Sequence, residues 1–327
     1  MKNEYISFEY PTEEAKQHHL VGYINEQIES GHAADLVAEG EAWHDHQLAQ
    51  IARDISSRPE VRLVLLAGPS SSGKTSTSHR LCLHLLEMDK NPVPLSVDNW
   101  YMDGILTPRD EEGKKDYESI YAIDLQQLET DLEALIAGKE VALPTFNFAE
   151  EHREYLGDTL RLEEDSILVI EGIHALNPLL MAHIDRACKY KIYAAPMSPV
   201  SLDGERWIPT WYHRLLRRMS RDLRTRGKAP LDTIVSWASV REGENKWIEP
   251  FRSEADALFD TSMTYELPAI RLRVETALQS VPASAPEYTV AEQLLYYLSF
   301  FEPLEASLIP RTSLLREFIG GSQFNVG

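Results

Sequence analysis

The 327-residue sequence has little cysteine, few basic residues and no long apolar runs. Its two cysteines, Cys82 and Cys188, cannot supply a disulfide framework, so we expect a reducing compartment and a cytoplasmic protein. No stretch approaches about 18 consecutive apolar residues, which argues against a membrane-spanning helix, and the first residues lack the apolar core of a secretory signal. Only 32 basic residues stand against 52 acidic ones, and this formal charge of −20 argues against a nucleic-acid partner.

Apolar runs alternate with helical patterns along the chain. Short, mostly apolar runs are typical of strands buried on both faces of a sheet, and they occur at 62–68, 94–97, 166–170, 190–195 and 256–264. Apolar residues at helical spacing predict helices over 41–56, 75–88, 125–137, 210–226 and 231–247, and a mostly helical tail from 282 to about 318. Residues 153–162 alternate around Gly157 and predict a hairpin. The order of elements predicts a three-layer α/β fold with a parallel sheet.

One glycine-rich segment carries the strongest chemical signal. It reads GPSSSGKT, follows a predicted buried strand, opens a predicted helix and matches the phosphate-binding pattern G-x-x-x-x-G-K-[ST]. Glycines let successive backbone amides point into one concavity, and the helix start adds unpaired donors. Lys74 would bring its charge to the β- and γ-phosphates, and the Thr75 hydroxyl would bind Mg²⁺. The residues predicted to hold nucleotide phosphates are Gly68, Ser70, Ser71, Ser72, Gly73, Lys74, Thr75 and Ser76.

Two missing motifs narrow the kind of phosphate-binding protein. A guanine-nucleotide switch would need Asn-Lys-x-Asp, but Asn245-Lys246 continues as Trp247-Ile248. The Leu-Ser-Gly-Gly-Gln signature of transporter ATPases is also missing. Both absences favour a small-molecule kinase.

Two acidic residues end predicted strands beside this loop. Asp98 could take the proton from an attacking hydroxyl and hold an Mg²⁺-bound water, although an aspartate there could also only cap the next turn. Glu171 follows the apolar run SILVI, where a carboxylate would bind the metal or only stabilise the strand end. Because ligands bind outside the carboxyl ends of parallel strands, we expect both acids near the glycine-rich loop.

Positive charge is concentrated in one segment of this acidic chain. Residues 213–228 hold seven arginines and lysines against one aspartate, a net +6 within the total of −20. Apolar residues mark one helix face, and Arg218, Arg221 and, by spacing, Arg217 project from another. Such a helix could be a lid that neutralises charge on a transferred phosphoryl group, or only a solvated basic face.

Taken together, these motifs resemble the uridine kinase/phosphoribulokinase family, with greatest similarity to bacterial uridine kinase-like nucleoside kinases. The resemblance covers about residues 40–265 and follows the family's motif order. The segments that carry it are 68–75, 98–101, Glu118 with 122–124, 144–148, 170–172 and the arginine pattern of 217–227. It implies a P-loop NTPase fold with a kinase domain over 57–281, a lid at about 210–230, and helical extensions over 1–56 and 282–327.

The resemblance also implies a role for each matching residue. Lys74 and Thr75 would handle ATP phosphates and Mg²⁺, Asp98 would be the base for a nucleoside 5′-hydroxyl, and Glu171 would bind Mg²⁺. Arg221 and Arg226 would clamp phosphates, Arg218 would reach sugar hydroxyls, and Tyr101 would line the acceptor pocket. Glu118 replaces the family's diol-binding aspartate, while Phe146 and Glu151 replace a base-reading tyrosine and histidine. This last change puts uridine specificity in doubt, because lost base-edge hydrogen bonds weaken discrimination.

The leading hypothesis is an ATP- and Mg²⁺-dependent kinase that phosphorylates a hydroxyl of a nucleoside-like small molecule. One alternative is a kinase of a sugar phosphate, in which surplus lid arginines such as Arg214 and Arg224 would bind the acceptor's phosphate. A second alternative is a nucleotide-binding regulatory protein without turnover. The apolar tail beyond 282 offers surface for a partner or for a second copy in a homo-oligomer.

Overall fold

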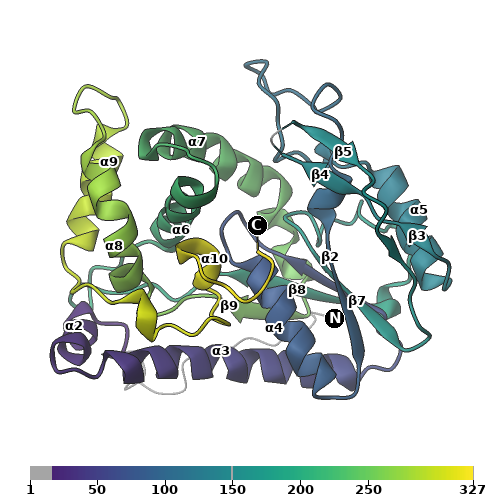
Figure 1. Ribbon diagram of the computed structural model, residues 1–327, viewed down its shortest axis with the longest axis horizontal. Helices are drawn as coiled ribbons and strands as arrows, with labels where there is room; N and C mark the ends of the chain where they lie inside the picture. The colour runs from purple at the N-terminus through teal and green to yellow at the C-terminus, as the bar shows by residue number, and fades with distance from the viewer. Residues whose placement is uncertain (1–16, 149, 327) are drawn as a thin grey trace.

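The computed structural model describes residues 17–148 and 150–326 (Figure 1). The central sheet contains β1 (Leu63–Ala67), β2 (Asn91–Ser96), β7 (Ser166–Glu171), β8 (Lys189–Ala195) and β9 (Ala257–Asp260). Two small ribbons contain β3 (Val141–Ala142), β4 (Thr145–Asn147), β5 (His152–Glu154) and β6 (Thr159–Leu160). The helices are α2 (Val21–Glu29), α3 (Ala33–Ser56), α4 (Lys74–Leu86), α5 (Leu125–Ile136), α6 (Thr210–Thr225), α7 (Pro230–Trp247), α8 (Glu266–Gln279), α9 (Tyr288–Leu298) and α10 (Arg316–Ile319).

The five central strands form one parallel sheet in the order β2-β7-β1-β8-β9. Every residue of β1, β7 and β8 is buried, as expected for strands covered on both faces. Successive side chains alternate between two cores: Val64 and Leu66 join one, while Leu63 and Leu65 join the other. The expected three-layer α/β fold with a parallel sheet is therefore confirmed.

Different helices cover the two faces. The larger core packs α3, α4, α6, α8 and α9 against one face of the sheet, and α5 contributes to the smaller core on the other face. In Figure 1 the long helix α3 runs beneath the molecule, and α10 lies between α4 and α6. The sheet is therefore a rigid platform whose strand ends are free to carry functional side chains.

The predicted hairpin over 153–162 is wrong. The strands on either side of Gly157 do not pair with each other: β5 pairs with β4, and β6 pairs with β3. Both ribbons belong to one antiparallel excursion that reverses between β4 and β5. Gly157, with φ +97°, only interrupts its returning arm. The alternating pattern indicated extended backbone correctly but did not indicate its partner.

Several predicted ends and segments also differ. The strand expected over 256–264 stops at Asp260, whose carboxylate accepts hydrogen bonds from the Met197 amide at 2.8 Å and the Ser262 amide at 2.9 Å. The helix expected from residue 41 already begins at Ala33 and passes through Gly40, which faces the Tyr265 ring. Helix α2 also lies within the first 40 residues, where helical spacing predicted no helix.

The tail is less helical than predicted, and one helix was overlooked. Residues 299–315 contain only a short 3₁₀ turn, as expected where prolines at 303 and 310 remove amide donors. Helix α8 was missed, although its buried Leu267, Ile270, Val274 and Leu278 follow helical spacing. Among the described residues, no helix is long and apolar enough to cross a membrane. The expectation about a secretory signal falls on the first residues, and 1–16 lie outside the described part of the chain.

Candidate active site

The glycine-rich segment Gly68–Thr75 forms the turn between β1 and α4, and we call it the P-loop. A Cβ on Gly68 would lie 1.9 Å from the Ala194 carbonyl oxygen, so only glycine fits where the loop leaves the sheet. Gly73 has φ +89° and occupies the N-cap of α4. The first hydrogen bond within α4 runs from the Thr77 amide to the Gly73 carbonyl at 3.0 Å. The preceding amides have no partner within the helix and are suited to an anion.

Lys74 and Thr75 begin α4 and face the end of β7. The Lys74 side chain is buried, and its Nζ donates to the Pro69 carbonyl at 3.3 Å. The Thr75 hydroxyl donates to the Glu171 carboxylate at 3.3 Å. Glu171 is the last residue of β7, between β2 and β1 in the sheet, so the strand order brings it to the P-loop.

Asp98 lies in the 3₁₀ turn Val97–Trp100 that follows β2. Its amide donates to the Ser96 hydroxyl at 3.3 Å, so Ser96 caps this turn and not the Asp98 carboxylate, which was the alternative that the sequence left open. Burial raises the pKa of Asp98, while Lys74, Arg221 and Arg226 oppose that rise. The carboxylate therefore lies within electrostatic reach of the P-loop lysine and of the predicted lid arginines.

The two strand-end acids influence each other. Burial, followed by the charge of Asp98, raises the pKa of Glu171 to about 7, while Lys74 opposes the rise. The predicted positive and negative groups thus come together at the carboxyl edge of the sheet. This arrangement suits a site that receives phosphate oxygens and a hard cation, since Mg²⁺ prefers carboxylate, hydroxyl and phosphate oxygens.

Helix α6 brings arginines over the P-loop. Arg218 donates to the Ser70 hydroxyl at 2.7 Å. Burial, followed by the charge of Arg226, lowers the pKa of Arg221 to about 10. Three guanidinium groups surround the fully buried Asp222: Arg226 at 3.3 Å, Arg218 at 3.6 Å and Arg221 at 3.8 Å. This aspartate holds the arginine group together, a role that we did not predict.

Arg217 does not project with Arg218 and Arg221, contrary to its spacing. It is fully buried, and its Nε donates to Glu266 of α8 at 3.1 Å. Its two terminal nitrogens donate to the Thr261 carbonyl at 2.6 Å and the Thr261 hydroxyl at 3.1 Å. Arg217 also donates to the Ser72 carbonyl at 3.4 Å, so it ties α6 to α8 and supports the P-loop backbone from within the core.

The two arginines offered for an acceptor phosphate have protein partners. Arg214 pairs with Glu244 of α7 through both terminal nitrogens, and its Nη2 lies 2.8 Å from the Glu244 Oε2. Its Nη1 also donates to the Ser70 carbonyl at 3.1 Å. Glu244 also accepts from the Ser70 amide at 3.2 Å, so it braces the P-loop. Arg224 donates to the Glu317 carbonyl at 2.9 Å. No sequence motif indicated Glu244, because it is one of several acids on a helix without a strong apolar stripe.

An aromatic cluster lies on the acceptor side. The buried Tyr101 contacts the rings of Tyr117, Phe146 and Phe148, with centroids 5.6–6.0 Å apart. Its hydroxyl donates to the Tyr117 carbonyl at 3.1 Å. Asp98 and Glu118 are among the charges that raise the pKa of Tyr101, after burial. The rings thus lie beside the carboxylates.

Glu118 is a half-buried carboxylate near Tyr101 and Arg218. Burial raises its pKa to about 7, and the nearby Arg218 opposes that rise. Its Oε2 is buried and accepts no hydrogen bond from the described residues. A Cβ on Gly243 would lie 2.4 Å from the Glu118 Cβ, so a glycine of α7 makes room for it. Glu151, at a position where the family has a base-reading histidine, instead pairs with Lys115.

Comparisons with known proteins show the family of this chain. The model of the Phosphoribulokinase / Uridine kinase family matches residues 63–267, well over half of the chain. A uridine kinase of Lactobacillus helveticus is 29% identical over 198 residues, covering 60% of this chain and 84% of that protein. A uridine kinase of Chloroflexus aurantiacus is 29% identical over 224 residues, covering 67% and 97%. A solved D-glycerate 3-kinase from Cryptococcus neoformans has a TM-score of 0.44 at 11% identity, covering 64% and 89%. The chain therefore belongs to the phosphoribulokinase/uridine kinase family and is a P-loop kinase of small molecules.

Proposed function

We propose that this chain transfers the γ-phosphoryl group of ATP, with Mg²⁺, to a primary hydroxyl of a nucleoside-like acceptor. The observation that carries the proposal is the convergence of Lys74, Asp98 and the lid arginines at one edge of the sheet, beside an aromatic cluster. In phosphoryl transfer the protein mainly positions the reactants and neutralises charge. We therefore propose a kinase domain over 57–281, with a lid at about 210–230.

Nucleotide binding would use the P-loop. Its amides and the orphan donors of α4 would hold the phosphates of ATP, while Lys74, Arg221 and Arg226 would neutralise their charge. The Thr75 hydroxyl and the Glu171 carboxylate, 3.3 Å apart, are suitable oxygen ligands for Mg²⁺. Bound there, the metal would offset charge that develops on the phosphate oxygens. Deprotonated Glu171 is the form that binds, and the neighbouring Lys74 favours that form.

Asp98 would act as the general base. It would accept the hydroxyl proton as the acceptor oxygen attacks the γ-phosphorus, and ADP would leave on the opposite side. The half-buried position and the raised pKa of Asp98 suit a group that must take a proton. Lys74 and the lid arginines keep its charged form accessible before the acceptor arrives.

A flat, uncharged acceptor is favoured by the lining of the space beside Asp98. The rings of Tyr101 and Phe146 would contact a planar base, and Glu118 with Arg218 would bind sugar hydroxyls. A phosphorylated acceptor is less well supported, because Arg214 already pairs with the Glu244 carboxylate and Arg224 donates to the Glu317 backbone carbonyl. Phe146 and the Lys115-bound Glu151 offer no base-reading hydrogen bonds like those of the uridine–cytidine kinases, so we propose a nucleoside class without a particular base.

A coupled assay of ADP release tests this proposal. The panel contains purine and pyrimidine nucleosides, ribulose 5-phosphate and pantothenate, each with ATP and Mg²⁺. We expect a nucleoside to raise ADP release most, and Asp98→Asn to abolish that increase. The exposed Asp165→Asn is the matched control and should keep the wild-type rate. The proposal fails if no acceptor raises ADP release above the rate with water alone.

A further inference from the structure

A segment near the C-terminus of the described chain lies against the P-loop and α4. The family match stops at residue 267, and the segment after α9 returns to the centre of the molecule (Figure 1). We call residues 309–324 the C-terminal strap. It carries α10 between α4 and α6, and its last ring, Phe324, stacks on His79 of α4 at a centroid distance of 5.3 Å. A segment outside the matched family region thus covers the start of the phosphate-binding helix.

The strap contacts the P-loop through a carboxylate. Glu317 accepts hydrogen bonds from the Ser76 amide at 3.1 Å and from the Ser76 hydroxyl at 2.9 Å. The Ser76 amide is one of the orphan donors of α4 and was predicted to hold a nucleotide phosphate. Leu314 packs on the loop beside it, since a Cβ on Gly73 would lie 2.5 Å from the nearest Leu314 methyl. The Glu317 carboxylate therefore occupies the Ser76 amide, a donor that is suited to a phosphate of the nucleotide.

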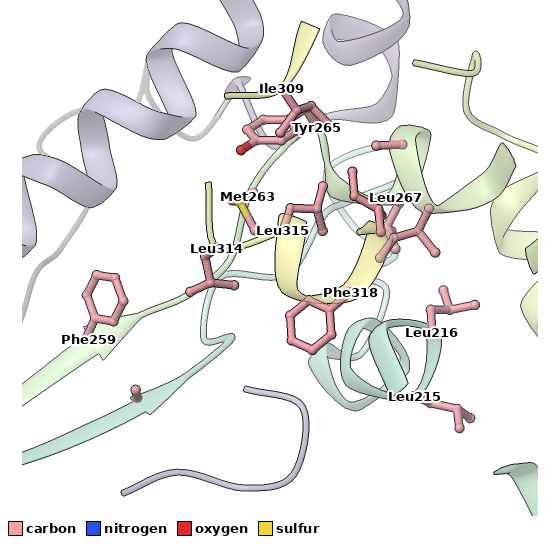
Figure 2. Close-up of a cluster of buried hydrophobic side chains, with 14 of the residues drawn as sticks. Leu215, Leu216, Phe259, Met263, Tyr265, Leu267, Ile309, Leu314, Leu315 and Phe318 are labelled. Carbon is pink, nitrogen blue, oxygen red and sulfur yellow. The ribbon is translucent and has the colours of Figure 1, made fainter. Parts of the chain in front are cut away.

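The strap is held as part of the core. Leu314, Leu315 and Phe318 point among side chains of α6 and of the segment after β9 (Figure 2). The Phe318 carbonyl accepts from the Ser220 hydroxyl at 3.2 Å, and the Arg217 guanidinium lies 5.4 Å from the Phe318 ring centroid. Arg224 donates to the Glu317 carbonyl at 2.9 Å. The same helix that supplies the lid arginines thus holds the strap in place.

The charge of Glu317 reaches the predicted catalytic groups. After burial and Asp98, it contributes to raising the pKa of Glu171. Burial lowers the pKa of Arg221, and the charge of Glu317 opposes that decrease. The Glu317 side chain is only 5% exposed, so water screens it little. A nucleotide phosphate arriving at α4 would meet this negative charge at short range.

We propose that the C-terminal strap is an autoinhibitory element, in which Glu317 occupies a phosphate-binding amide and must leave it before a nucleotide binds fully. The proposal rests on the proposed function of the P-loop. Nucleotide and strap compete for the same donor, so each weakens the binding of the other by the same factor.

Two substitutions and a matched control test the competition. Glu317→Gln removes the charge and keeps the size, while Glu317→Ala removes the hydrogen bonds as well. The exposed Glu305→Gln makes the same charge change on the same tail. Calorimetric titration with MgADP should show binding on the order of tenfold tighter in both Glu317 variants. A gain of about threefold is the minimum expected, and the control should bind as the wild type does.

Hydrogen exchange of the wild-type chain tests the same idea without a substitution, and it decides the matter if the variants fold poorly. Saturating MgADP should speed exchange at the strap amides 315–320. Unchanged or weaker MgADP binding in the Glu317 variants, or slower exchange in the strap, would overturn the proposal while leaving the kinase function intact. If neither wild type nor variants bind MgADP or ATP, the proposed function itself fails, and the autoinhibitory role fails with it.

Discussion

At the scale of single residues, the site is defined by acids held away from water. Asp98, Glu118 and Glu171 all have pKa values raised by burial, and basic groups oppose each rise. The sequence placed Asp98 and Glu171 at one edge of the sheet, because Asp98 follows β2 and Glu171 ends β7; their chemical roles stay predictions. It could not predict Asp222 or Glu244, since their importance comes from the arginines that folding brings to them.

Glu118 should make stability depend on pH. Its pKa of about 7 in the folded chain exceeds the ordinary 4.5 of the unfolded chain. Below about pH 4.5 Glu118 is protonated in both the folded and the unfolded chain, and it costs no stability. Between about pH 4.5 and 7 it ionises only in the unfolded chain, so the free energy of unfolding falls. The loss is complete above about 7 and amounts to at most roughly 3 kcal/mol.

Glu118→Gln should therefore stabilise the chain at pH 8 and have little effect at pH 4.5. Urea unfolding of wild type and variant at both pH values measures the difference. The exposed Glu164→Gln is the control and should show no such pH dependence. An equal effect of Glu118→Gln at the two pH values would contradict the assignment of a raised pKa.

At the scale of elements, the sequence predicted a strand or helix best where the pattern that specifies it lies within the element itself. Strands β1, β7 and β8 were predictable because their apolar runs are buried on both faces, and α4 because a P-loop must open a helix. The pairing of β5 and β6 was not predictable, since an alternating pattern indicates extended backbone without its partner. Helical spacing gave Arg217 a direction but not its partners: it is buried against Glu266 and reaches only the backbone of the P-loop, at the Ser72 carbonyl.

The link between α6 and α8 should depend on a buried ion pair. Arg217 and Glu266 are both fully buried, and His213 also contacts Glu266. Glu266→Gln leaves the Arg217 charge uncompensated and should lower the free energy of unfolding by about 3–5 kcal/mol.

The control lies on the same helix. Glu275 pairs with Arg271 on the surface of α8, and Glu275→Gln should cost less than about 1 kcal/mol. Denaturant unfolding of the two variants gives both values. Similar costs for the two substitutions would show that the buried pair does not link α6 to α8 as described.

At the scale of the whole molecule, the described segments on both sides of the family match contribute to the core. Helix α3 packs against α4 and β9, and the strap fills space between α4 and α6. Helical spacing predicted a helix over 41–56 and a mostly helical tail, but it could not predict these contacts, because it does not indicate partners distant in the sequence. Gly40, which looks like a helix breaker, is tolerated within α3 where the Tyr265 ring lies against it.

Removing the strap's aromatic anchor should therefore affect the whole chain. Phe318 is fully buried, and Phe318→Ala should lower the free energy of unfolding by about 3–5 kcal/mol through lost burial and a cavity. The exposed Leu308→Ala, a few residues earlier, should change it little. Calorimetry of both variants checks the comparison, and a small effect at Phe318 would show that the tail is not integral to the fold.

The central claim is that the P-loop and Asp98 together move a phosphoryl group to a small-molecule hydroxyl. The most direct measurement follows label from γ-phosphate-labelled ATP in the presence of the best nucleoside acceptor. We expect label in a nucleoside monophosphate, matched one for one by ADP, with the rate lowered about 10²–10⁴-fold by Asp98→Asn. Label found only in inorganic phosphate, or an Asp98→Asn variant as fast as the wild type, would contradict it.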